Sequence, residues 1–214
     1  MSAPILFTFD IFGTVVDWRR GLALDLAAAG CELADADFER VVDAQGTDEQ
    51  AGFRPYREIT ARSLVSELGI DSTQAERIGT GLGRWPVFAD AVPGLRALLE
   101  LAPCVAMTNS DRSHGAGVRR TLGFELSDWI CAEDVRVYKP SREFWHAVSQ
   151  RRQTPFGAGW WHVSAYADYD LEVARELGLT TVFVQRSHCR PGPAQYHVRD
   201  LLELAAHAAS ASRG

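Results

Sequence analysis

Four residues of this chain have the types and positions that a hydrolytic site needs. Asp10 and Thr108 each stand at the end of a short apolar run, Lys139 precedes a proline, and Asp170 follows another apolar run by a few residues. An aspartate carboxylate can act as a nucleophile, because an ester intermediate divides one difficult step into two easier ones. A nearby ammonium favours the ionised form of a carboxylate. We therefore expect Asp10 to be a nucleophile that Lys139 keeps ionised and oriented.

The neighbours of these residues suit the binding of an anionic group. Thr108 and Asn109 offer neutral hydrogen-bond donors, and the backbone N–H groups of residues 11–14 can form a concavity for an anion. Asp170 is placed to hold the lysine and to help position water. Structural roles stay open as well. Asp10 could be a turn residue at the end of a strand, and Thr108, Asn109 and Asp170 could cap helices.

Short apolar runs alternate with helical patterns along most of the chain. Runs that are apolar on both faces predict buried strands, and they are Pro4–Phe9, Cys104–Thr108, Trp129–Cys131, Gly159–Ser164 and Thr180–Gln185. Helical periodicity predicts helices at Pro93–Leu101, Ser113–Leu122, Ser141–Arg152, Asp170–Leu177 and His197–Ala206. This alternation indicates a parallel sheet with helices on both faces. Residues just beyond the carboxyl ends of such strands converge on one crevice.

A helix-only segment interrupts the alternation after the first strand. Residues 19–85 contain four helical patterns, at Leu22–Ala29, Ala34–Gln50, Tyr56–Leu68 and Ser72–Leu82. They indicate a helical cap domain at residues 17–86, inserted into a core domain of residues 1–16 and 87–214. An insert at this point lies where a parallel sheet binds ligands. Its acidic stretch, Asp43–Gln50, is expected to be a solvated helix face.

The composition limits the class of protein. The 214 residues are 46% hydrophobic and 23% charged, which excludes a disordered chain. The net charge of −6 argues against a general nucleic-acid binder, which needs a concentrated basic face. Cysteines without tight spacing favour reduced thiols, and neither a signal peptide nor a membrane-spanning run is predicted. We expect a cytoplasmic protein with no nucleic-acid, membrane, metal or cofactor partner, and leave a homodimer open.

Four ordered motifs resemble those of the haloacid dehalogenase-like (HAD) hydrolases. They are FDIFGTVVD, MTNS, VYKPSREF and HVSAYADYDLEVARELGL, and the helical insert resembles the first cap type of that superfamily. The resemblance spans nearly the whole chain. It implies an α/β fold with a Rossmann-like, doubly wound parallel sheet and a helical cap domain after the first strand. It also implies catalytic roles for Asp10, Lys139 and Asp170, with an ester formed on Asp10.

Two departures from the phosphatases of this superfamily bear on the reaction. Those enzymes carry a general acid, an aspartate, two residues after the nucleophile, where this chain has Phe12. Their metal-binding pattern places a second acid one, four or five residues before the last one, and here Tyr169, Tyr166 and Ala165 stand there. Mg²⁺ prefers one or two carboxylates together with water and phosphate, whereas a halide leaves without a general acid. Both departures favour carbon–halogen chemistry without a metal.

The implied reaction resembles that of the 2-haloacid dehalogenases. Asp10 attacks the carbon that bears the halogen, and water then hydrolyses the ester and releases a 2-hydroxy acid. Those enzymes carry a halide-binding arginine on the cap, typically directly after a tryptophan. The residues that align with this Trp-Arg pair here are Val42 and Asp43. Arg40 lies one helical turn from that position, and Arg54 or Arg57 is an alternative. The expected substrate-binding residues are Ile11, Phe12, Thr14, Thr108, Asn109, Ser110 and Arg40.

The sequence therefore predicts a metal-independent hydrolase of the (S)-2-haloacid dehalogenase type, acting on a small carboxylate. A Mg²⁺-dependent small-molecule phosphatase of the same superfamily is the alternative. Because the halide-binding arginine of the dehalogenase cap is missing at its aligned position, a hydrolase of another small activated acid also stays open. A binding module that has lost its activity is a further possibility, and the complete set of Asp10, Lys139 and Asp170 argues against it.

Overall fold

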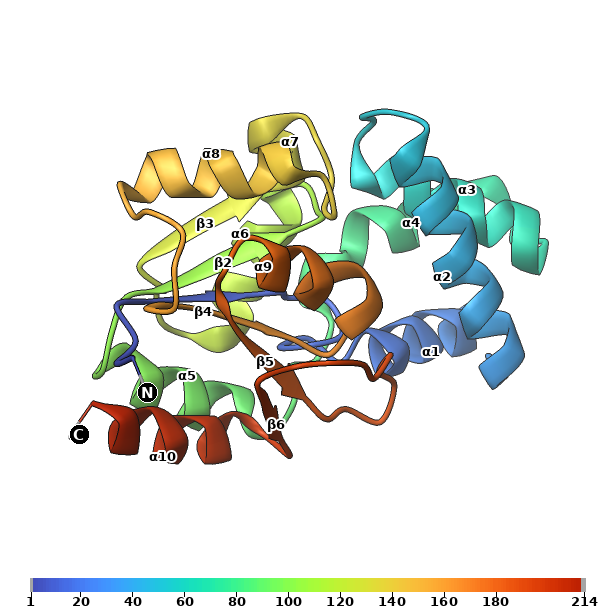
Figure 1. Cartoon of the computed structure of the whole chain (residues 1–214). Helices are drawn as coiled ribbons and strands as arrows, with labels where there is room; N and C mark the ends of the chain where they lie inside the picture. Colours follow the sequence, from blue (N-terminus) through green and yellow to red (C-terminus); the bar gives the residue numbers. More distant parts are fainter. Residues whose placement is uncertain (1, 213–214) are drawn as a thin grey trace.

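The computed structural model describes residues 2–212, which form a parallel sheet with helices on both faces and further helices beyond one end (Figure 1). The strands are β1 (Leu6–Phe9), β2 (Cys104–Thr108), β3 (Asp128–Cys131), β4 (Trp160–Ser164), β5 (Thr180–Val184) and β6 (Tyr196–Val198). Their order is β3-β2-β1-β4-β5-β6, and all neighbours are parallel. The strand order reverses at β1, so the ligand crevice of such a sheet lies at the carboxyl ends of β1 and its neighbours. The predicted Rossmann-like α/β fold is confirmed.

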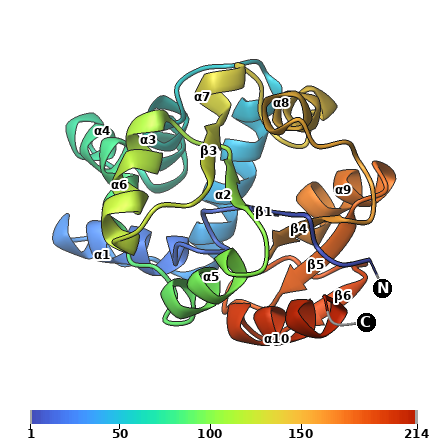
Figure 2. The same ribbon diagram turned by 90° about the vertical axis from the view of Figure 1, so that its left-hand side faces the viewer.

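The core helices cover both faces of the sheet. They are α5 (Ala91–Leu99), α6 (Arg112–Leu122), α7 (Ala132–Val135), α8 (Arg142–Arg152), α9 (Glu172–Glu176) and α10 (Leu201–Ala211). α5 and α10 lie against one face, and α8 and α9 lie against the other (Figures 1 and 2). β1, β2, β4 and β5 are buried at every residue. Burial on both faces explains why their sequences read as continuous apolar runs.

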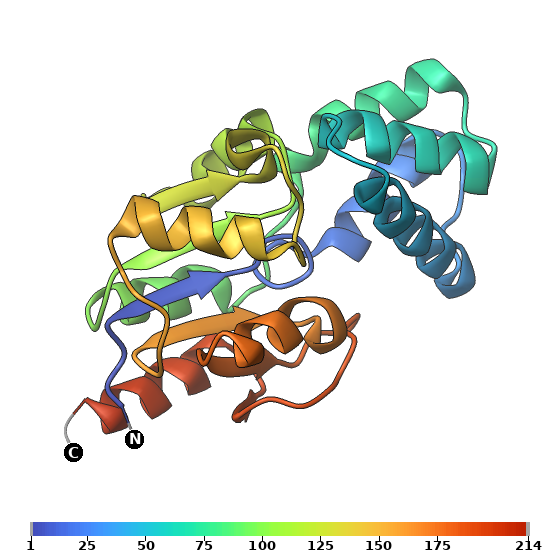
Figure 3. The ribbon, with the colours of Figure 1, turned by 45° about the horizontal axis from the view of Figure 1, so that its top comes forward.

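A group of four helices lies beyond the carboxyl ends of the strands, and we call it the insert (Figure 3). It consists of α1 (Trp18–Ala28), α2 (Asp35–Gln50), α3 (Tyr56–Leu68) and α4 (Ser72–Gly81), followed by a short 3₁₀ turn, η1 (Leu82–Arg84). Local signals set its helix ends. The side chains of Asp17 and Asp71 accept backbone N–H groups at the starts of α1 and α4. Gly69 ends α3 with a φ of 66°.

The C-terminal third departs from the predicted elements. β6 pairs with β5 where the sequence predicted the start of a helix at His197, and α10 begins only after Asp200, which accepts the N–H of Glu203. A π-helical turn, η2 (Ala167–Leu171), replaces the first turn of the helix predicted from Asp170. Within residues 2–212, no helix combines the length and apolar character needed to span a membrane.

Candidate active site

The side chains of Asp10, Lys139 and Asp170 meet at the carboxyl ends of β1 and β4. Lys139 Nζ donates hydrogen bonds to Asp10 Oδ1 at 3.1 Å and to Asp170 Oδ2 at 2.8 Å. The side chains of Lys139 and Asp170 have no exposed surface, whereas that of Asp10 keeps 7%. Asp10 is therefore the member of this cluster that a substrate can reach.

The two carboxylates share one ammonium unequally. Burial raises the pKa of Asp10 above its ordinary value, although Lys139 opposes the rise, and the charge of Asp170 adds to it. Burial acts in the same sense on Asp170, but Lys139 and His162 outweigh it and hold the pKa of Asp170 well below its usual range. Lys139 thus acts on the pKa of Asp10 in the expected sense, but its effect is smaller than that of burial. An ionised Asp10 is poorly hydrated, which suits a nucleophile.

The loop after β1 orients Asp10. Thr14 Oγ1 donates to Asp10 Oδ2 at 2.7 Å and accepts the backbone N–H of Ala165 at 3.0 Å. Thr14 is fully buried, so it orients Asp10 and is not exposed to a ligand in the cavity, contrary to the prediction that it contacts substrate. Gly13 has a φ of 94°, and a Cβ atom there would lie 2.7 Å from the hydroxyl of Tyr166. The Tyr166 hydroxyl therefore lies directly against the Asp10 loop.

Asn109 holds the main chain of Lys139. Its Oδ1 accepts the N–H of Lys139 at 2.8 Å, and its Nδ2 donates to the Lys139 carbonyl at 3.0 Å. The same Nδ2 lies 2.8 Å from the Tyr169 hydroxyl and 3.0 Å from Oε2 of Glu49. Asn109 thus positions Lys139 and also joins the core to a carboxyl group of the insert.

The other residues predicted after β1 and β2 divide into two groups. Thr108 and Phe12 line the cavity described below. Ser110 and Ile11 have no exposed surface, and Ser110 Oγ accepts from Thr108 at 3.3 Å. The side chains of Ser110 and Ile11 therefore pack beneath the cavity wall and do not reach the cavity. The N-cap of α6 is Asp111, so the capping alternative considered for Thr108 and Asn109 does not hold.

A cavity of about 280 Å³ separates the strand ends from the insert. Its lining residues are Asp10, Phe12, Trp18, Val42, Gln45, Gly46, Glu49, Gln50, Tyr56, Thr108, Asn109, Tyr166, Asp168, Tyr169 and Arg190. The hydroxyl of Tyr166 is buried there and has no hydrogen-bond partner within the part of the chain that the structure describes. An unpartnered buried hydroxyl in a cavity wall is a natural contact for a ligand.

The cation at this cavity is not the one that the sequence predicted. Arg40 is half-exposed and contacts Asp37 at 2.8 Å and the Glu67 carbonyl at 3.2 Å. Arg40 precedes the cavity-lining Val42 by two residues, and such residues point to opposite sides of a helix. The prediction of Arg40 as a cavity residue is therefore wrong. Arg190, from the loop between β5 and β6, lines the cavity in its place.

Arg190 is surrounded by carboxylates. Its Nη2 lies 2.6 Å from Asp43 and 3.1 Å from Glu39, and its Nη1 lies 3.9 Å from Asp168. Its backbone bonds to both Ala165 and Ala167 and so fixes it beside the Asp170 segment. The sequence offered no signal for this residue, because its loop matches none of the four motifs.

The position of Glu49 in the cavity wall contradicts the prediction that Asp43–Gln50 is a solvated face. Val42, Gln45, Gly46 and Glu49 all line the cavity, and Gln45 is almost completely buried. Their spacing of three, four and seven residues defines one face of α2. This spacing was the available signal, and the acidic composition of the stretch obscured it.

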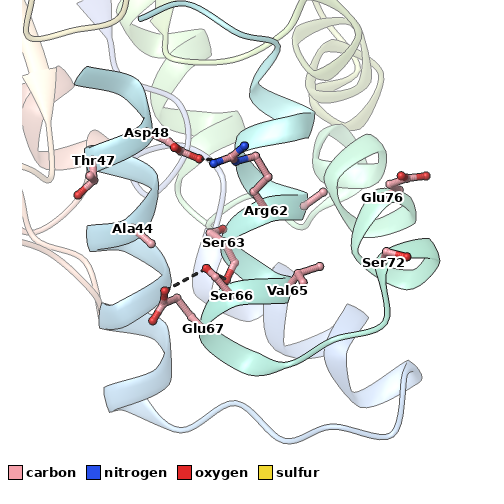
Figure 4. Close-up of a pocket in the computed structure, with 11 residues that line it drawn as sticks. Ala44, Thr47, Asp48, Arg62, Ser63, Val65, Ser66, Glu67, Ser72 and Glu76 are labelled. Atoms are coloured by element: carbon pink, nitrogen blue, oxygen red, sulfur yellow. Dashed lines mark hydrogen bonds and ion pairs between the residues drawn. The ribbon is translucent and has the colours of Figure 1, made fainter. Parts of the chain in front are cut away.

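A larger hollow of about 620 Å³ lies on the outside of the insert (Figure 4). Its lining comes entirely from α2, α3 and α4. Asp48 and Arg62 form an ion pair at its wall, with Oδ2 and Nε 3.1 Å apart. Adjacent residues of α2 therefore serve different surfaces, because Asp48 lines this outer hollow and Glu49 lines the cavity at Asp10.

The carboxylates at the strand ends do not form a magnesium site. One oxygen of Asp10 and one of Asp170 face the Lys139 ammonium, while the others face Thr14 and His162. The three positions for a second metal-binding acid hold two tyrosines and an alanine. Among residues 2–212, no group of three or more His, Cys, Asp or Glu side chains is placed to hold a metal ion. Because every carboxylate oxygen of Asp10 and Asp170 already faces another side chain, this arrangement does not offer the free oxygen ligands that the near-octahedral shell of Mg²⁺ needs.

Comparison with known proteins gives matches among solved structures. No protein-family model matches the chain, and no curated protein matches it in sequence. The L-2-haloacid dehalogenase PA0810 is 25% identical, with a TM-score of 0.81 over 97% of this chain and 99% of its own. The L-2-haloacid dehalogenase from Xanthobacter autotrophicus with chloropropionic acid covalently bound is 16% identical, with a TM-score of 0.80 over 95% and 97%. YfnB from Bacillus subtilis, a HAD-type protein with bound magnesium, is 17% identical, with a TM-score of 0.76 over 97% and 99%.

The sheet order and the helical insert after β1 define the haloacid dehalogenase-like fold. Within this fold, the chain resembles L-2-haloacid dehalogenases over nearly its whole length. The resemblance predicted from the four motifs is thus confirmed at the level of the fold. A magnesium-bound protein matches as well, so the fold by itself does not determine the reaction.

Proposed function

We propose that the protein is a metal-independent hydrolase that cleaves the carbon–halogen bond of a small 2-haloacid, with Asp10 as the nucleophile. The observation that carries this proposal is the position of the Lys139 ammonium between Asp10 and Asp170. It leaves Asp10 facing the cavity without the oxygen ligands that a magnesium ion requires. Phe12 stands where a phosphatase carries its general acid, which also favours a leaving group that departs as an anion.

In this mechanism, an oxygen of Asp10 attacks the carbon that bears the halogen. A carbon–oxygen bond forms, the carbon–halogen bond breaks, and its electron pair leaves with the halide. Water then attacks the carboxyl carbon of the Asp10 ester, which regenerates the carboxylate and releases a 2-hydroxy acid and a proton. Lys139 orients Asp10 throughout, and Asp170 holds Lys139 in place.

Substrate binding draws on a different set of residues from the one predicted. We assign the substrate carboxylate to the Arg190 side of the cavity, with Thr108 and the unpartnered Tyr166 hydroxyl as neutral contacts. The backbone N–H groups of Ile11 and Phe12 add to this set, because neither has a backbone partner among the described residues. We further propose that residues 17–86 act as the cap of the cavity.

Halide release tests the proposal against its alternative. The purified protein is incubated with 2-chloropropionate and, separately, with p-nitrophenyl phosphate and Mg²⁺, each with and without EDTA. We expect chloride release that EDTA does not change. Phosphate release that EDTA abolishes, without any chloride release, would identify the phosphatase instead.

Isotope labelling tests the nucleophile itself. A single turnover in H₂¹⁸O places label in the Asp10 carboxylate if water hydrolyses an ester, and mass spectrometry of the peptide that contains Asp10 detects it. Asp10→Asn should release no halide and should keep its circular dichroism spectrum. Label confined to the product would indicate direct attack of water on the substrate.

A further inference from the structure

Glu49 lies on the cavity-facing side of α2, in the last turn of the helix, and within the described part of the chain one of its carboxyl oxygens is free to contact a leaving group. In-line displacement sends the leaving group away from the attacking oxygen, and so from the strand ends toward the insert. The other polar side chain in the middle of this helix face, Gln45, is engaged, because it donates to Ser63 at 3.1 Å and accepts from Tyr56 at 2.9 Å. Glu49 is held at one oxygen by Asn109, 3.0 Å away, which leaves its other oxygen for a ligand.

The surroundings of Glu49 favour its neutral acid. Burial raises its pKa to about 8, against the opposing effects of the Asn109 hydrogen bond and the Lys139 ammonium, and the charges of Asp10 and Asp170 add to the rise. The nearby hydroxyls of Tyr56, Tyr138 and Tyr169 remain neutral, because burial raises the pKa of each. At neutral pH the carboxyl group therefore carries a proton that it can share.

We propose that Glu49, as a carboxylic acid, donates a hydrogen bond to the departing halide and thereby favours 2-fluoro acids as substrates. This inference rests on the proposed function. Fluoride is the conjugate base of a weak acid and accepts hydrogen bonds strongly, whereas chloride is a weak acceptor. The carbon–fluorine electron pair leaves with fluoride, and the hydrogen bond from Glu49 stabilises the charge that develops there.

Two substitutions distinguish the loss of the hydrogen-bond donor from the loss of the titratable proton. Glu49→Leu removes the donor, and we expect defluorination of 2-fluoropropionate to fall about 10²-fold, with less than about a tenfold effect on 2-chloropropionate. Glu49→Gln keeps an N–H donor but cannot ionise. The adjacent Asp48→Asn is the matched control, because Asp48 lines the outer hollow (Figure 4). Thermal unfolding of each variant shows whether it is folded.

The pH dependence supplies a second readout. As the pH rises through about 8, the wild type loses the Glu49 proton, so fluoride release should decline. Glu49→Gln should show no such decline, and Asp48→Asn should follow the wild type. The proposal is wrong if Glu49→Leu slows both substrates equally, or if the decline persists in Glu49→Gln. An unlabelled Asp10 after turnover in H₂¹⁸O would instead refute the proposed function itself.

Discussion

His162 Nε2 lies 3.1 Å from Asp170 Oδ1, and neither side chain has any exposed surface. On the other side of the imidazole, Nδ1 lies 2.7 Å from Thr8 Oγ1, which in turn accepts the indole N–H of Trp160 at 2.7 Å. Asp170 is therefore supported by a chain of buried polar groups on β1 and β4. Because Asp170 also accepts a hydrogen bond from Lys139, which donates to Asp10, this chain extends to Asp10.

Replacing His162 by phenylalanine tests how much this chain contributes to stability. Phenylalanine keeps a ring next to Trp145, whose ring centroid is 4.5 Å from that of His162. It removes the ring nitrogens that face Thr8 Oγ1 and Asp170 Oδ1, which leaves one hydrogen-bonding position of each residue unpaired, although Trp160 and Lys139 still contact them. Unpaired buried groups cost about 1–3 kcal/mol each, so we expect His162→Phe to lower the free energy of unfolding by about 2–5 kcal/mol in urea titrations.

The exposed His146 provides the control for this substitution. It packs on Phe156 at the surface of α8, and His146→Phe should change the free energy of unfolding by less than about 0.5 kcal/mol. Equal effects of the two substitutions would show that the contacts of the His162 ring nitrogens do not contribute.

Asp10 and Asp170 were predictable members of the site because each follows a strand that is apolar on both faces, whereas Lys139 lies beyond α7 and was indicated by its motif. Asp10 and Thr108 directly end such strands, and parallel strands bring their carboxyl ends to one edge. Arg190 and Glu49 were missed for a different reason. Their place at the cavity depends on how the insert and the β5–β6 loop pack on the core, and local periodicity does not encode that packing. β6 was missed because three residues are too few to show a strand pattern.

Gly13→Ala should disturb the Asp10 loop. A Cβ atom would lie 2.5 Å from the ring of Tyr166, and the φ of 94° is unfavourable for alanine. We expect kcat to fall roughly tenfold or more, because even a small displacement of a reacting group slows the chemical step strongly. Gly30→Ala is the control, because Gly30 has a φ of 80° and nothing within 4 Å of the added atom. It should lose stability but keep kcat, and an equal loss of kcat in both variants would contradict the role of the Tyr166 contact.

Arg190→Ala should weaken the binding of an anionic substrate. It removes the guanidinium from the cavity and leaves the carboxylates of Glu39, Asp43 and Asp168 without it. Loss of a charge-assisted hydrogen bond suggests a rise in KM of roughly tenfold or more, with a smaller effect on kcat. Steady-state halide release measures both. Arg199→Ala, which removes an exposed arginine paired with Glu203, should leave KM unchanged. An unchanged KM in Arg190→Ala would show that the substrate carboxylate binds elsewhere.

Acidification should inactivate the protein before it unfolds it. Burial raises the pKa of Asp10 above its ordinary value of 3.8, and a protonated Asp10 is not a nucleophile, so kcat/KM should fall while the pH is still above that value. The pKa of Asp170 is shifted in the opposite direction. Its pKa is lowered by folding, so its contribution to stability is complete above the ordinary carboxyl pKa and is lost only as the pH falls below it. Halide release and circular dichroism, followed together from about pH 7 to about pH 3, should show two separate transitions, with activity lost at the higher pH. Coincident transitions would mean that unfolding, and not protonation of Asp10, ends the activity.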